Sequence, residues 1–202
     1  MGLILANQEN HTTLNEEEKE GLKIKSIATR QELNEFEQQN IETAISWLMK
    51  RNISIELFLS EKFLKNLHYK MFGSVWLWAG TFRKSNTNLG IDWRVVPVEL
   101  KKLFDDCLYW LENKTFSGTE IAIRFKHRLV FIHPFPNGNG RLSRLMADTM
   151  MEKIFEKPAF SWGGLSVNSN NNEETRYIDA IHKADKGNFD DLIKFSMSGL
   201  KY

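Results

Sequence analysis

The sequence predicts an all-α protein, a bundle of amphipathic helices with one short β-hairpin. Apolar side chains recur every three or four residues along most of the chain, which is the spacing of one face of an α-helix. Proline and glycine interrupt this pattern where loops between helices are expected. One segment departs from it, with β-favouring residues on either side of a turn-forming centre. A chain of 202 residues is long enough to bury one core without disulfides.

Caps and apolar faces predict the helices of the first third. The run Thr13-Leu14-Asn15-Glu16 fits a capping box that opens a short acidic helix through Glu20, and Gly21 ends it. A long helix is expected over Thr29–Lys50. Its apolar face is Leu33, Phe36, Asn40, Ile41, Ala44, Trp47 and Leu48, and the next helix, capped by Ser54 or Ser60, carries Phe63, Leu64, Leu67 and Met71.

The β-favouring segment lies between these helices and the second half of the chain. Thr81–Arg83 and Ile91–Val96 favour strands, and Asn86, Asn88 and Gly90 between them favour a turn. We therefore expect a short hairpin or flap there. Further helices are expected over Leu100–Glu112, over Thr119–Ile132, from about Gly140 to Glu156 before Pro158, over Glu173–Lys186 and over Phe189–Met197, with a polar loop at Ser161–Asn172.

The most informative stretch of the chain is His133-Pro134-Phe135-Pro136-Asn137-Gly138-Asn139-Gly140-Arg141-Leu142-Ser143-Arg144. Its prolines and glycines cannot continue a helix, so it forms a tight loop that opens directly into the next helix. Such a helix start presents free backbone N–H groups and partial positive charge, and Arg141 and Arg144 project from one side of the first turn. This arrangement predicts a site for a di- or triphosphate, with His133 beside it as a proton carrier near neutral pH.

This stretch resembles the signature of the Fic family, His-x-Phe-x-(Asp/Glu)-Gly-Asn-Gly-Arg-x-x-Arg, and departs from it only at Asn137. The run Trp78–Arg83 is similar to the start of the Fic flap, and the region around Tyr177 is similar to the C-terminal helices of Fic domains. The resemblance implies a Fic-type helical bundle. Its expected parts are an N-terminal helical extension at 1–56, a Fic domain at 57–197 and a tail at 198–202.

Members of that family move AMP, or less often another phosphate-bearing group, to a side-chain hydroxyl on a target protein. The resemblance makes His133 the general base, although a lone histidine is more often a core residue that caps a helix. Asn139 would donate an amide to the α-phosphate as its charge grows. Arg141 would hold the β-phosphate. For the arginines, the alternatives are ordinary surface charge or pairing with Asp148.

The donor nucleotide would be ATP, held by the same loop. Gly138 and Gly140 would let the backbone approach phosphate oxygens, and Arg144 would hold the γ-phosphate or the leaving pyrophosphate. Tyr177 could stack on the base, and a core tyrosine is an equally good interpretation. GTP, UTP and other donors stay open on the sequence alone.

Asn137 stands where the family has an acid that holds Mg²⁺ against the phosphates. A neutral amide offers one carbonyl oxygen and no charge, so weaker Mg²⁺ binding is expected. Three functions follow from this difference: an enzyme with a weak metal requirement, transfer of a different group, or a nucleotide-binding regulatory module with little catalysis. Retention of His133, Asn139 and both arginines favours the first.

Two further features of the family are expected here. Many members carry an inhibitory glutamate in a Ser/Thr-x-x-x-Glu-Gly/Asn motif that pairs with the second signature arginine. Glu20-Gly21 matches the end of that motif, but Glu16 occupies its first position, so a solvated helix end is the favoured interpretation. Glu37 is a second candidate. The target protein would dock on the flap at 80–96, and a homodimer or an antitoxin-like regulator is a further partner to consider.

Bulk composition excludes several other classes of protein. The formal net charge is +1, so there is no electrostatic case for nucleic acid or membrane as a partner. The single cysteine, Cys107, lies on an apolar helical face and is expected to be a buried thiol in a cytoplasmic protein. The N-terminus lacks the basic flank of a signal peptide. His68 has no second histidine or cysteine at chelating spacing, which favours a structural role.

Overall fold

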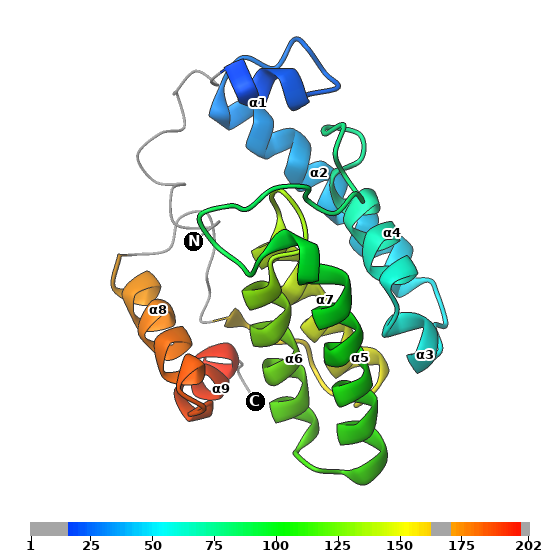
Figure 1. Cartoon of the computed structure of the whole chain (residues 1–202), viewed down its shortest axis with the longest axis vertical. Coiled ribbons are helices and arrows are strands. Elements are labelled where there is room, and N and C mark those ends of the chain that lie inside the picture. Colours follow the sequence, from blue (N-terminus) through cyan, green and yellow to red (C-terminus); the bar gives the residue numbers. More distant parts are fainter. Residues whose placement is uncertain (1–15, 163–170, 199–202) are drawn as a thin grey trace.

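A computed structural model describes residues 16–162 and 171–198, which fold as helices joined by loops (Figure 1). The predicted all-α fold is confirmed. The helices are α1 (Glu16–Gly21), α2 (Arg30–Met49), α3 (Ile55–Phe58), α4 (Glu61–Phe72), the 3₁₀-helix η1 (Trp93–Val95), α5 (Val96–Asn113), α6 (Gly118–Ile132), α7 (Asn139–Lys153), α8 (Asn171–Asp185) and α9 (Asp190–Met197).

Side-chain caps set where several of these helices begin. Thr29 and Glu32 form a complete capping box at the start of α2. Ser54 and Ser60 both act as caps, the first for the short α3 and the second for α4. Ser117 caps α6 in the same way. The expected capping box at 13–16 and most of the polar loop expected over 161–172 lie outside the described residues.

The expected β-hairpin is wrong in its strands. Between α4 and α5 the described chain forms loops, and the run predicted as the second strand becomes η1 and the start of α5. Pro97 explains part of this change, because its fixed φ favours the first turn of a helix. Side chains supply the loop's hydrogen bonds: Asn86 Oδ1 accepts from the Trp93 N–H at 3.0 Å, and Asp92 caps Arg94. We keep the name flap for residues 80–96.

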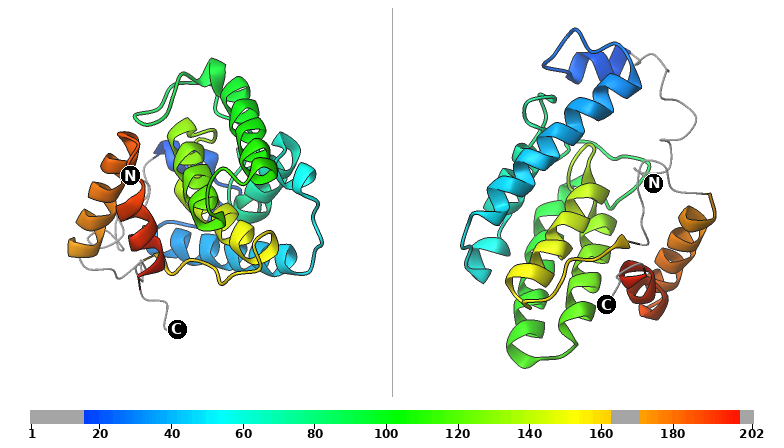
Figure 2. Two further views of the ribbon diagram at one scale, coloured as in Figure 1. Left: turned by 90° about the horizontal axis from the view of Figure 1, so that it is seen from below. Right: turned by 180° about the vertical axis from the view of Figure 1, so that it is seen from behind.

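The helices pack in layers that place α6 at the centre. Helix α6 packs against α5 on one side and α7 on another, and α9 also contacts it (Figures 1 and 2). Helix α4 contacts α2, α5 and α7, so it joins the N-terminal helices to this central group. The C-terminal helices α8 and α9 pack as a pair beside α6. The turn from α6 to α7 therefore lies where several elements meet.

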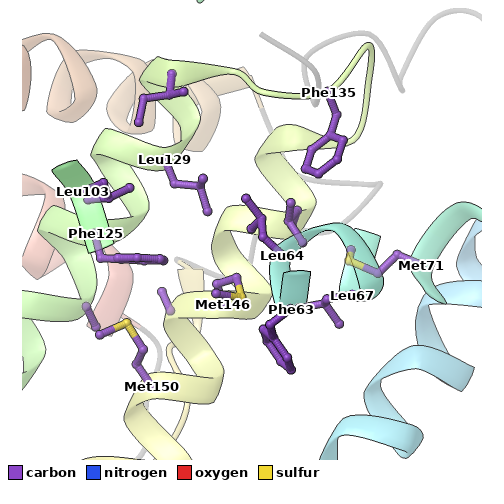
Figure 3. Packing of buried hydrophobic residues seen from close by; sticks show 14 of the residues in the cluster. Phe63, Leu64, Leu67, Met71, Leu103, Phe125, Leu129, Phe135, Met146 and Met150 are labelled. Carbon is purple, nitrogen blue, oxygen red and sulfur yellow. The ribbon is translucent and has the colours of Figure 1, made fainter. Parts of the chain in front are cut away.

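The core follows the predicted apolar faces, with one exception on α2. Phe135 is fully buried and reaches from the loop between α6 and α7 toward the buried side chains of α4 and α7 (Figure 3). Cys107 is also buried, and burial raises the pKa of its thiol to about 12, so it is an unreactive core residue. Phe36, expected on the buried face of α2, is 40% exposed, and Glu37 beside it is buried instead. No described helix is long and apolar enough to cross a bilayer.

Candidate active site

The backbone turns sharply from α6 into α7 at two left-handed residues. His133 ends α6 with φ 55°, and Gly138 precedes α7 with φ 79°. A Cβ on Gly138 would lie 2.5 Å from the ring of Phe72, so both the conformation and the space require glycine. The predicted tight loop therefore occupies 134–138, and α7 presents its N-terminus at the end of it.

Asn139 holds this loop closed. Its Oδ1 accepts from the Phe135 N–H at 2.9 Å, and its Nδ2 donates to the Phe135 carbonyl at 2.8 Å. The side chain is buried, with 2% of the residue exposed. The sequence suggested that this amide donates to the α-phosphate, but the structure uses one amide hydrogen for the loop. Asn139 therefore shapes the anion site from within.

A buried histidine braces the loop from below. The Gly80 N–H donates to His68 Nδ1 at 2.9 Å, so Nε2 carries the proton and donates to the Asn137 carbonyl at 3.1 Å. The His68 ring stacks on Phe135 with centroids 3.7 Å apart. Burial lowers the pKa of His68 to about 3, so the ring is neutral at physiological pH. His68 therefore has the structural role expected for it, and it joins the flap to the loop.

His133 has the protonation pattern of a general base. Its Nδ1 lies 3.3 Å from the Val130 carbonyl, so Nδ1 carries the proton, and Nε2 keeps a lone pair that no described residue engages in a hydrogen bond. The side chain is half-buried, and burial lowers its pKa below the ordinary value. A neutral imidazole with an available Nε2 is what proton removal from a hydroxyl requires.

Glu37 engages the first signature arginine. Arg141 Nη1 lies 2.6 Å from Glu37 Oε2, and Glu37 Oε1 accepts from Trp76 Nε1 at 2.6 Å. The guanidinium of Arg141 also lies over the Phe72 ring, 4.7 Å from its centroid. Glu20, which the sequence ranked ahead of Glu37, is exposed near the end of α1. The N-terminal glutamate that contacts the signature is therefore Glu37, and the signature residue that it contacts is the first arginine, Arg141.

The second signature arginine has an N–H without a partner among residues 16–162 and 171–198. Arg144 Nη1 is buried there and makes no hydrogen bond. Asp148 does not take this N–H: its carboxylate accepts from Trp162 Nε1 at 3.0 Å and from the Phe160 N–H at 3.2 Å. A buried, unpaired guanidinium N–H is costly unless an anion completes it. This is the feature that the predicted phosphate site requires.

Tyr177 lies against the same arginine. Its hydroxyl accepts a hydrogen bond from Lys126, a fully buried lysine of α6 whose ammonium lies 4.8 Å from the centre of the Tyr177 ring. Burial raises the pKa of Tyr177, but the charges of Lys126 and Arg144 outweigh burial and bring that pKa below its ordinary value. Tyr177 is therefore anchored through its hydroxyl, and its ring is partly buried.

Residues 16–162 and 171–198 do not form a protein-only Mg²⁺ site. Asn137 is exposed, and its Oδ1 accepts from the Gly138 N–H at 2.7 Å. The part of the chain described by the structure contains no group of three or more His, Cys, Asp or Glu side chains that could hold a metal. One neutral carbonyl oxygen is too few ligands for a dedicated cation site.

Two of the three buried charged residues of this site, Glu37 and Lys126, carry weak sequence signals. Glu37 follows Leu33 by four residues and precedes Ala44 by seven, so the helical period places it on the buried face of α2. Lys126 follows Ala122 by four residues on the buried face of α6. A charge at such a position marks a buried polar contact. The burial of Arg83 in the flap has no such signal, because a loop has no period.

Comparison with known proteins identifies the domain that carries this loop. Residues 58–151 match the model of the Fic/DOC family. The chain is 25% identical over 159 residues to the protein adenylyltransferase Fic of Aedes aegypti, which covers 77% of this chain and 30% of that protein. It is 32% identical over 92 residues to a probable protein adenylyltransferase of Aquifex aeolicus, covering 45% of this chain and 26% of that protein.

Solved structures show the same fold. The N-terminal FIC domain of Bep8 from Bartonella sp. 1-1C matches with a TM-score of 0.68 at 17% identity, over 89% of this chain and 90% of that chain. BepC from Bartonella tribocorum, solved with bound AMPPNP, matches with a TM-score of 0.65 at 17% identity, over 93% of this chain and 91% of that chain. The chain is similar to the Fic/DOC family over residues 58–151. This chain spans about 30% of the length of the Aedes aegypti protein.

Proposed function

We propose that this protein is a nucleotidyltransferase that moves AMP from ATP to a serine, threonine or tyrosine hydroxyl of a target protein. The observation that carries the proposal is the convergence of three features on one loop: a neutral His133, the N-terminus of α7, and Arg144 Nη1. Within residues 16–162 and 171–198, neither His133 Nε2 nor Arg144 Nη1 has a hydrogen-bond partner. The relatives named as adenylyltransferases support the same reaction.

The proposed mechanism is a single in-line displacement at the α-phosphorus. The target oxygen attacks phosphorus while Nε2 of His133 takes its proton, and the bond to the β-phosphate oxygen breaks as pyrophosphate leaves. The backbone N–H groups at the start of α7 would hold α-phosphate oxygens, shaped by the Asn139 closure of the loop. Arg141 and Arg144 would hold the β- and γ-phosphates, which become the leaving group. The target segment would lie along the flap at 80–96.

Labelled ATP separates this reaction from the other candidates. The protein would be incubated with a lysate and with ATP labelled on either the α- or the γ-phosphate, beside His133→Ala. Transfer of AMP labels protein bands only from α-labelled ATP, and only with His133 present. Label from γ-labelled ATP would show transfer of another phosphate-bearing group. ATP binding without label from either would show a nucleotide-binding module and contradict the proposed reaction.

We further propose that Glu37 restrains this activity. While Glu37 holds Arg141, the guanidinium is not available to a β-phosphate, and Trp76 fixes the carboxylate in that position. Glu37→Gln removes the charge but keeps an acceptor for Trp76. It should raise α-label transfer by at least about fivefold, the lower end of ordinary coupling energies. The matched control is Glu35→Gln, an exposed change on the same helix. Equal labelling by the two variants would contradict a restraining role for Glu37.

A further inference from the structure

Arg83 is a buried arginine in the flap whose donors are used by backbone carbonyls. Only 4% of the residue is exposed. Its Nε donates to the His133 carbonyl at 2.6 Å, and its Nη1 donates to the Ser85 carbonyl at 2.9 Å. Its Nη2 donates to the carbonyls of Ile91 and Ile132. One side chain thus joins both sides of the flap loop to the C-terminal end of α6.

Two of these acceptors are carbonyls at the end of α6, where the helix itself supplies no partner. They are the carbonyls of Ile132 and His133, and the helix dipole is negative there. The acceptors on the flap side are the carbonyls of Ser85 and Ile91, which lie in the loop where the expected hairpin strands do not form. A planar guanidinium with five N–H donors in a fixed fork can satisfy both sets at once. The backbone reinforces the link, because the Arg83 N–H donates to the Pro134 carbonyl at 3.0 Å.

The flap also lies directly against the proposed base. Gly90 has φ +97°, and a Cβ built on it would lie 2.5 Å from His133 Cβ and 3.0 Å from Arg83 Nη2. His133 itself has a left-handed backbone, which a side chain keeps only when its surroundings hold it there. The position of the imidazole is therefore set by Gly90 and by Arg83, both of which belong to the flap.

We propose that Arg83 is the positioning residue of this site, which fixes the His133 imidazole and the flap as one unit. The proposal rests on the proposed function, in which His133 is the base and the flap carries the target. Arg83 would hold both His133, the base, and the flap that carries the target hydroxyl, so the distance between base and hydroxyl would stay constant. Transfer to a docked side chain requires this constant distance. Arg83 lies away from the phosphate contacts of α7, so its role concerns the acceptor and the base rather than the nucleotide.

The electrostatics agree with this geometry. Burial is the main cause of the lowered pKa of His133, and the charge of Arg83 lowers it further, whereas the hydrogen bond to Val130 raises it. Among the described residues, Arg83 is the charged side chain that lowers the pKa of His133. Loss of that charge should therefore raise the pKa and leave less neutral base at a given pH.

The test compares Arg83→Gln, Arg83→Lys and Arg94→Gln. Arg94 is the matched control, because it carries the same charge in the same flap with its side chain 69% exposed. The first measurement is an NMR titration of the histidine rings in the nucleotide-free protein, with His133 assigned by its absence in His133→Ala. The second is transfer of α-labelled AMP, measured as kcat and KM for ATP across pH.

Arg83→Gln should raise the His133 pKa, move the acid limb of the pH–rate profile to higher pH and lower kcat about 100-fold, the usual cost of a misplaced catalytic group. The KM for ATP should change less than about threefold, because the phosphate contacts remain. Arg83→Lys keeps the charge but not the fork, so the titration should stay near that of the wild type while kcat falls at least about tenfold. Arg94→Gln should change neither the pKa of His133 nor kcat.

A wild-type titration in Arg83→Gln, or a wild-type kcat in Arg83→Lys, would overturn the proposal. If Arg83→Gln does not fold, Arg83→Lys decides the question through kcat. The absence of transfer by the wild-type protein would contradict the proposed function instead, and the titration of His133 would then decide the role of Arg83 on its own.

Discussion

At the scale of single residues, the site depends on two histidines that carry their protons on opposite nitrogens. His68 accepts at Nδ1 and donates at Nε2, both to backbone groups, so its ring serves only to brace the loop. His133 donates at Nδ1 and keeps Nε2 free. Both rings are kept neutral by burial, but only His133 has a nitrogen available for chemistry. The backbone hydrogen bonds therefore separate a structural histidine from the one proposed to be catalytic.

The lowered pKa of His133 predicts the pH dependence of transfer. A general base must be neutral, so kcat/KM should rise as pH passes through the His133 pKa and then become constant. Because burial lowers that pKa below 6.5, the half-maximal rate should occur below pH 6.5. The measurement is kcat/KM for ATP across pH. An acid limb of the pH–rate profile centred above pH 7 would show that His133 is not the buried neutral base described.

The contacts of Asn139 predict that its replacement lowers the stability of the protein and removes no charged contact. Asn139→Ala leaves the N–H and the carbonyl of Phe135 without their partner inside the core. Each buried group left unpaired costs about 1–3 kcal/mol. The control is Asn113→Ala, an exposed asparagine that donates to the Tyr109 carbonyl. Urea unfolding should show a clear decrease in the free energy of unfolding for Asn139→Ala and little change for the control. Equal values would mean that Asn139 does not hold the loop closed.

At the scale of elements, the proposed active site lies where α2, the flap and α7 meet the end of α6. Helix α2 contributes Glu37, and the flap contributes Arg83 and Gly90. Neither element contains a signature residue. Because α2 and the flap both reach residues of the signature, a change in either alters the site without touching the loop itself.

Gly90 gives a clean test of the contact between flap and base. Gly90→Ala places a methyl group against His133 Cβ in a position with φ +97°. Gly187 has a similar φ of +88°, and an added methyl group there would meet nothing within 4 Å, so Gly187→Ala carries the backbone strain alone. Both variants should lose some stability, and only Gly90→Ala should also lose transfer activity, by about 100-fold. Equal activities in the two variants would show that Gly90 does not set the position of His133.

The difference between sequence and structure is clearest at the same elements. The signature loop, the α6 and α7 helices beside it and the long helix expected over Thr29–Lys50 follow from local sequence, and the structure confirms them. The hairpin failed because tertiary contacts of Arg83 and Asn86 take the place of strand pairing, which β-propensity does not reveal. The pairing of Glu37 with Arg141 joins residues 104 apart in the chain, so local sequence suggests it only as a candidate.

At the scale of the whole molecule, the signature helix is tied to both ends of the chain. Helix α7 reaches α2 through the Arg141–Glu37 pair, and its Asp148 holds the segment after it through Trp162. Lys126 of α6 reaches α8 through the Tyr177 hydroxyl. The loop proposed to bind phosphate therefore lies between helices that contact both the N-terminal and the C-terminal helices of the described chain.

Asp148 makes the stability of this assembly depend on pH. Burial raises its pKa from 3.8 to about 6, so the folded protein keeps a proton that the unfolded chain loses between these values. The stabilisation from this proton is complete below about pH 4 and is lost as pH rises to about 6. Asp148→Asn cannot ionise and should be more stable than the wild type at pH 7, by up to about 3 kcal/mol at about 1.4 kcal/mol per pKa unit.

Urea unfolding at pH 4 and pH 7 measures this effect. The two proteins should be closely similar at pH 4 and differ at pH 7. Asp106→Asn, an exposed aspartate on α5, is the control and should show no such difference. A wild-type protein at least as stable as Asp148→Asn at pH 7 would mean that the carboxylate is stabilised in its charged form.

The most direct measurement of the central claim is a crystal structure of Glu37→Gln with a non-hydrolysable ATP analogue. We expect the triphosphate to lie at the N-terminus of α7, with a phosphate oxygen hydrogen-bonded to Arg144 Nη1. Nε2 of His133 should face the α-phosphorus from the side of the flap. An analogue bound elsewhere, or a triphosphate that leaves Arg144 unpaired while the flap covers Nε2 of His133, would contradict the central claim.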